Sequence, residues 1–74
     1  MKTKVKWDNL IKLASGIQSN HPEIRYGQSL MIALNNLDMG IYEEICNTEA
    51  DCFYDDSKCM EFFTEVSTRW EEST

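Results

Sequence analysis

Apolar residues recur at every third or fourth position in four separate segments of this chain, and that spacing constrains the fold more than any other feature. The segments cover residues 4–18, 25–36, 39–46 and 57–70. Because an α-helix has 3.6 residues per turn, this spacing places the apolar side chains of each segment on one face. We therefore predict an all-α fold in which residues 1–74 form a small single domain of three to four short helices, with residues 71–74 frayed.

The residues between these segments are typical of helix ends. Pro22 predicts that the first helix stops shortly before it, since a residue that precedes proline disfavours the helical conformation. The two asparagines at 35–36 predict a C-terminal cap for the second helix, and Asp38 predicts an N-cap for the third. We expect Asp56 or Ser57 to cap the fourth helix.

Each predicted helix has one face that we expect to be buried. These faces are Trp7, Leu10, Ile11, Ala14 and Ile17 in the first helix, Leu30, Met31, Leu34 and Leu37 in the second, Met39, Tyr42, Ile45 and Cys46 in the third, and Cys59, Phe62, Phe63, Val66 and Trp70 in the fourth. So many aromatic residues for so small a core also raise the hypothesis of self-association into a homodimer.

Residues 47–56 form the least regular stretch of the chain, and we expect an ordered loop there. Two adjacent aromatic side chains seldom both remain in water, so Phe53 or Tyr54 is expected to anchor this loop on the core. On the outer side of the fourth helix, Glu65 and Arg69 have the spacing of a favourable ion pair.

The charge of the chain changes sign halfway along. Residues 1–37 carry a net charge of +3 and residues 38–74 a net charge of −9, which gives −6 for the 74 residues together. An acidic surface repels nucleic acid and anionic lipid but attracts basic protein surfaces. We therefore expect a protein partner with a basic surface, no direct contact with nucleic acid, and no membrane association.

The residue types needed for catalysis or metal binding are sparse. Three cysteines lie six and seven residues apart, without the Cys-x-x-Cys pair typical of structural zinc sites, and we expect them to be free thiols packed as small apolar residues. An EF-hand calcium loop would require glycine at the position of Asp56 and glutamate at that of Phe62. A looser cation site at residues 51–56 stays open, but we predict no metal, no cofactor and no enzymatic activity.

The acidic side chains of the second half are the candidate partner-binding residues. They are Glu43, Glu44, Glu49, Asp51, Asp55, Asp56, Glu61 and Glu65. The alternative is a DNA mimic, in which these carboxylates would imitate a row of phosphates and occupy a DNA-binding channel of another enzyme. No apolar run is long enough to span a bilayer, so we expect a cytoplasmic location.

Two short motifs carry a resemblance to a known group of proteins. Arg25-Tyr26-Gly27-Gln28, followed by the hexapeptide Asp-Cys-Phe-Tyr-Asp-Asp at 51–56, resembles a pattern in short uncharacterised proteins of tailed phages and prophages. This chain departs from the pattern at Ile32, where those proteins have asparagine, and at Cys52, where they have proline. The resemblance implies a phage-encoded helical protein that binds and inhibits or redirects a host protein, with a defence or nucleic-acid-handling factor as the expected class and the cytoplasm of the infected cell as its place of action.

The same motifs also predict a structural contact. Arg25 and Gln28 lie one helical turn apart, and we expect them to hydrogen-bond to carboxylates or carbonyls of the 51–56 loop. Gly27 would allow another stretch of backbone to approach closely, because it has no Cβ.

Overall fold

The computed structural model describes residues 2–72, and within them it confirms the all-α fold. The elements in chain order are α1 (Lys2–Asn20), α2 (Tyr26–Leu37), α3 (Met39–Ile45), a 3-10 helix η1 (Asp56–Lys58) and α4 (Cys59–Glu72). Fraying was predicted for residues 71–74, yet α4 continues through Glu72. The last two residues lie outside the described part of the chain.

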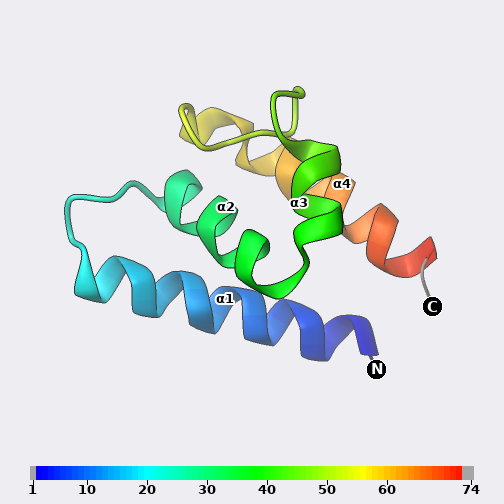
Figure 1. The fold of residues 1–74 in the computed structure, drawn as a ribbon, viewed down its shortest axis with the longest axis horizontal. Coiled ribbons are helices and arrows are strands. Elements are labelled where there is room, and N and C mark those ends of the chain that lie inside the picture. The colour runs from blue at the N-terminus through cyan, green and yellow to red at the C-terminus, as the bar shows by residue number, and fades with distance from the viewer. Residues whose placement is uncertain (1, 73–74) are drawn as a thin grey trace.

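Helices α1 and α2 form an antiparallel pair, α3 packs against α2, and α4 contacts both α3 and α1 (Figure 1). A loop over residues 46–55 leads from α3 to η1, so the predicted ordered loop is present. Helix α1 begins and α4 ends on the same side of the molecule (Figure 1). The 46–55 loop and η1 lie close to the start of α2 (Figure 1).

The core contains apolar residues from all four α-helices and from the loop. Its buried members are Leu10, Ala14, Leu30, Met31, Ala33, Leu34, Ile41, Ile45, Ala50, Cys52, Phe62, Val66 and Trp70. Three predicted core positions are wrong, because Ile11, Leu37 and Met39 are exposed at 38%, 44% and 60%. Leu13 and Ile41 take the places expected for Ile11 and Met39, which are about half a helical turn away on their helices.

The helix boundaries follow most of the predicted signals. Helix α1 ends at Asn20 and a turn follows at Pro22, as expected. The asparagine cap is wrong, since α2 continues through both asparagines and Asp38 is its C-cap. Asp38 is also the predicted N-cap of α3, where its Oδ1 accepts a hydrogen bond from the Ile41 amide at 3.3 Å.

The aromatic residues of the predicted apolar faces of α1 and α4 pack against one another. Trp70 and Phe62 are buried, and the Trp7 ring lies edge-on to the Trp70 ring with centroids 4.7 Å apart. Phe63 contacts Trp7 at a centroid separation of 5.5 Å. Trp7 and Phe63 remain partly exposed beside these buried rings, and self-association into a homodimer stays a prediction.

Candidate functional site

The structure divides the eight candidate partner-binding carboxylates into two groups. Residues 51, 55 and 56 hydrogen-bond to backbone amides, and the structure uses them to hold the loop in place. Residues 44, 49, 61 and 65 gather around a groove between the α3–loop junction and α4. The eighth, Glu43, is exposed on α3.

Within the first group, Asp56 belongs to a contact between the start of α2 and the loop, which we call the α2–loop contact. The Arg25 Nη2 donates a hydrogen bond to the Phe53 carbonyl oxygen at 2.6 Å, and its Nε lies 3.7 Å from the Asp56 carboxylate. Asp56 also accepts a hydrogen bond from the Gly27 amide at 3.0 Å. A carboxylate on a free amide at a helix N-terminus is favourable, so Asp56 stabilises α2 from 29 residues away in sequence.

Gly27 is required by this contact. A Cβ built on Gly27 would overlap the backbone carbonyl oxygen of Cys52 and lie 2.8 Å from Asp56 Oδ1. The Cys52 thiol donates to the Gly27 carbonyl at 3.4 Å. Burial, together with the nearby Cys59 thiol, raises the pKa of Cys52 to about 12, so its sulfur stays protonated and packs as an apolar group. The prediction of a close backbone approach at Gly27 is confirmed.

Two details of this region differ from the predictions. Gln28 does not reach the loop, because its Oε1 accepts a hydrogen bond from the Arg25 amide at 3.4 Å. The cap ahead of α4 is Asp55, one residue earlier than expected, and its carboxylate accepts from the Ser57 amide at 3.0 Å at the start of η1. Hydrogen bonds from the Ser57 hydroxyl and amide lower the pKa of Asp55. Asp56 is thereby left to cap α2.

The second group surrounds a groove with a volume of about 300 Å³, which we call the acidic groove. Ile45 and Ala50 close it from beneath, and Thr48, Glu49, Glu61, Glu65 and Arg69 line its sides. Arg69 pairs with Glu65 at 2.7 Å, as the spacing predicted, and also with Glu44 at 2.8 Å. Local spacing could not predict the pairing with Glu44, because it joins residues 25 positions apart.

The remaining two carboxylates of the acidic groove have no such neutralisation. Among the described side chains of residues 6–71, no cation pairs with Glu49 or Glu61. Both residues are exposed. The groove therefore presents two unpaired negative charges next to the ion pairs that Arg69 makes with Glu44 and Glu65.

A smaller hollow of about 120 Å³ lies on the other side of the turn that follows α3, and we call it the aromatic hollow. Tyr42, Asp51, Phe53 and Tyr54 line it together with Asn47. Phe53 packs on the core, as one of the two predicted anchors, whereas Tyr54 is 81% exposed. A hydrogen bond with Cys46 raises the pKa of Tyr42, and the negative charge of Asp51 adds to the shift.

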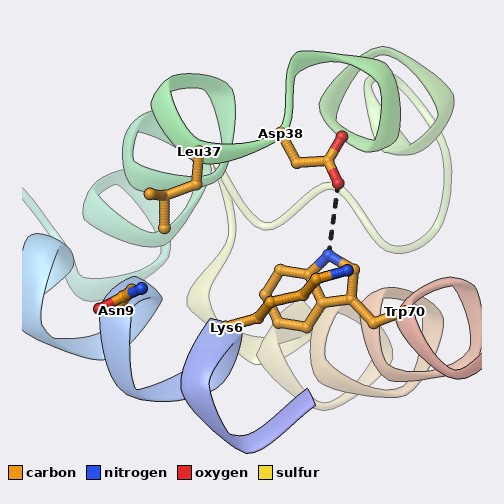
Figure 2. A pocket seen from close by; sticks show the side chains of 5 residues that line it. All are labelled: Lys6, Asn9, Leu37, Asp38 and Trp70. Carbon is orange, nitrogen blue, oxygen red and sulfur yellow. Dashed lines mark hydrogen bonds between the residues drawn. The ribbon is translucent and has the colours of Figure 1, made fainter. Parts of the chain in front are cut away.

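A third cavity, of about 170 Å³, lies between α1, the α2–α3 junction and α4 (Figure 2). Lys6, Asn9, Leu37, Asp38 and Trp70 line it. The Trp70 indole donates to the second carboxylate oxygen of Asp38 at 3.4 Å, and the Lys6 ammonium lies 5.8 Å from the Trp70 ring centroid. Asp38 thus ties the α2–α3 junction to α4, a structural role that helix-cap reasoning alone did not reveal.

Neither a metal site nor a membrane span is found in the part of the chain that the structure describes. No three side chains of His, Cys, Asp or Glu come together there in a way that could hold a metal ion. Within residues 2–72, none of the helices combines the length and apolar character that crossing a bilayer requires. The three cysteines are free thiols, with Cys52 buried and the other two partly exposed.

Comparison of the chain with models of protein families, with curated proteins and with solved structures returned no match.

Proposed function

We propose that this protein binds a second protein that carries a basic surface, and that it does so through the acidic groove without catalysing a reaction. The resemblance at residues 25–28 and 51–56 supports a phage origin and a host target in the cytoplasm of the infected cell. A defence or nucleic-acid-handling factor is the class of target that we propose. Stoichiometric binding would then inhibit or redirect that factor.

The observation that carries this proposal is the pair of unpaired carboxylates, Glu49 and Glu61, beside the neutralised residues of the same groove. Exposed like charges on one surface accelerate association with an oppositely charged protein. The groove gives these charges a concave setting, in which a lysine or arginine of the partner would lose part of its hydration and pair more strongly.

One feature of the groove and one of the neighbouring loop favour a discrete protein contact over DNA mimicry. Arg69 stands among the carboxylates, and residues 51, 55 and 56 face backbone amides of their own chain. A mimic of a phosphate backbone requires an unbroken row of negative charges, which a central guanidinium interrupts. Mimicry therefore has less support than a discrete contact with a basic protein surface.

The test is affinity capture from a bacterial host extract with two matched baits. One bait carries Glu49→Gln and Glu61→Gln, and the control carries Asp8→Asn and Glu23→Gln, which remove the same charge from exposed positions elsewhere. We expect the wild type and the control to retain the same protein in comparable amounts, and the groove variant to lose it. Equal retention by the groove variant, or no specifically captured protein at all, would contradict the proposal.

The salt dependence of the affinity, measured on the captured complex, distinguishes a discrete protein contact from DNA mimicry. A discrete contact loses affinity moderately as salt rises to about 0.5 M, where the Debye length is only a few ångströms. A mimic that displaces DNA loses nearly all of its affinity under the same conditions. Isothermal titration at several salt concentrations would measure the difference.

A further inference from the structure

We infer that the aromatic hollow receives the guanidinium group of an arginine side chain from a partner protein. The hollow combines three aromatic side chains, Tyr42, Phe53 and Tyr54, with the carboxylate of Asp51. The inference deepens the proposed function and rests on it for the source of that arginine. The hollow itself is separate from the acidic groove, although both are lined by residues of the segment 45–51.

The aromatic side chains make the hollow attractive to a cation. The Phe53 and Tyr54 rings meet at a centroid distance of 4.8 Å and an angle of 67°, so they form a bent wall. Tyr42 contributes to the lining from α3. Aromatic faces attract cations through their quadrupole, and arginine is the cation most often found on them.

Tyr54 supports a binding role because no structural role accounts for its position. It is 81% exposed, and its ring packs against the ring of Phe53, which already anchors the loop. Tyrosine and arginine are enriched among the residues that dominate the free energy of protein–protein binding. An exposed tyrosine beside a hollow provides such a contact surface at a low cost in conformational entropy.

Asp51 provides a fixed negative charge in the same hollow. Its Oδ2 accepts a hydrogen bond from the Asn47 amide at 2.8 Å, and its Oδ1 accepts from the Phe53 amide at 3.0 Å. Two backbone amides therefore hold the carboxylate, and each oxygen keeps a further lone pair for a ligand. Among the side chains that the structure describes, those of residues 6–71, no cation pairs with Asp51, so its charge is available. A pre-positioned carboxylate loses little freedom on binding.

The size and chemistry of the hollow select arginine over other occupants. A volume of about 120 Å³ accommodates a guanidinium group. A large apolar side chain would remove water from Asp51 and offer no hydrogen bonds in place of those that the water made. Lysine has a compact ammonium that is strongly hydrated and stacks less well than the planar guanidinium of arginine. Anionic partners are disfavoured by the net charge of −9 on residues 38–74.

The direct test is a nuclear magnetic resonance titration of the full chain with three short peptides. The probe is acetyl-Gly-Gly-Arg-Gly-Gly-amide, and the comparison peptides replace its arginine with citrulline, which is neutral and of similar shape, or with lysine. We expect the arginine peptide to shift the amide signals of Asn47, Asp51 and Phe53. The lysine peptide should bind several-fold more weakly, and the citrulline peptide should produce no saturable shift.

Variants at an exposed position keep the test independent of folding. Tyr54→Ala should lower the affinity for the arginine peptide about fivefold, as expected for the loss of one cation–π contact. Tyr54→Phe keeps the ring and should stay within about twofold of the wild type. Met60→Ala changes another residue that is 74% exposed, and it should leave binding unchanged.

Several results would overturn the inference. They are equal binding of the citrulline peptide, tighter binding of lysine than of arginine, an unchanged affinity in Tyr54→Ala, and signal shifts confined to other parts of the chain. The proposed function can fail separately. If the arginine peptide binds as expected while the Glu49→Gln and Glu61→Gln bait captures the same proteins as wild type, the hollow is supported and the acidic groove is not.

Discussion

The α2–loop contact and the acidic groove use the same residue types in opposite ways. At the α2–loop contact, the Asp56 carboxylate accepts a hydrogen bond from the Gly27 amide, and the neighbouring Asp55 accepts one from the Ser57 amide at the start of η1. In the acidic groove, Glu49 and Glu61 are exposed and pair with no cation among the described side chains of residues 6–71. The difference shows that acidic composition alone does not identify a binding surface, because part of the charge stabilises the fold.

The largest effect is expected from Gly27→Ala, which tests whether the α2–loop contact depends on close backbone approach. The new methyl group would overlap the Cys52 carbonyl oxygen, and backbone cannot yield as a flexible side chain does. We expect a loss of about 3 kcal/mol in the free energy of unfolding, measured by urea denaturation. Gly16→Ala is the control, since nothing lies within 4 Å of its Cβ, and it should gain about 0.5 kcal/mol.

A smaller loss is expected from Arg25→Gln in the same contact. The substitution removes the hydrogen bond to the Phe53 carbonyl and the ion pair with Asp56, both at half-exposed positions. We expect a decrease of about 1 kcal/mol in the free energy of unfolding. Lys12→Gln, on the exposed face of α1, should leave stability unchanged. Equal effects of the two substitutions would mean that Arg25 contributes only its charge.

Arg69→Gln tests how much the ion pairs of the acidic groove contribute to stability. The variant frees Glu44 and Glu65 and leaves four unpaired carboxylates around the groove. Because exposed ion pairs contribute little, we expect a loss of about 0.5 kcal/mol at low salt that disappears at about 0.5 M salt. A loss above that of Arg25→Gln would show that the groove also holds the fold together.

The smallest effect concerns the pKa of Asp55. Because hydrogen bonds from Ser57 lower this pKa, Asp55 stabilises the folded state above the ordinary carboxyl pKa, and this contribution is lost as the pH falls through the lowered value. Ser57→Ala removes the hydroxyl donor and should raise the pKa of Asp55 toward its ordinary value. A carbon-detected pH titration would measure the change. Thr68→Ala, which removes a hydroxyl bonded to the Thr64 carbonyl, should leave the pKa of Asp55 unchanged.

The elements of the fold could be predicted from the sequence because they depend on local spacing. The face of α4, the face of α2 apart from Leu37, the Asp38 cap of α3 and the close approach at Gly27 followed from periodicity and residue type. The positions that failed lie at the edges of apolar faces, such as Ile11 and Met39, where burial depends on the neighbouring helix. Periodicity cannot supply that information.

The candidate site was harder to predict, because the division of its carboxylates into two groups depends on tertiary contacts. Nothing local distinguishes Asp56, which caps a helix 29 residues away, from Glu61, which remains in solvent. Arg69 was predicted to pair within its own helix, and its second partner on α3 became visible only in the folded chain.

The most direct test of this division compares the unfolding free energies of two double variants by urea denaturation. Asp55→Ala with Asp56→Ala removes two helix-terminal acceptors, and we expect a loss of about 2 kcal/mol. Glu49→Ala with Glu61→Ala removes two unpaired surface charges, and the free energy of unfolding should stay within about 0.5 kcal/mol of the wild type. Equal losses in the two variants, or a larger loss in the second, would contradict the separation of folding carboxylates from binding carboxylates.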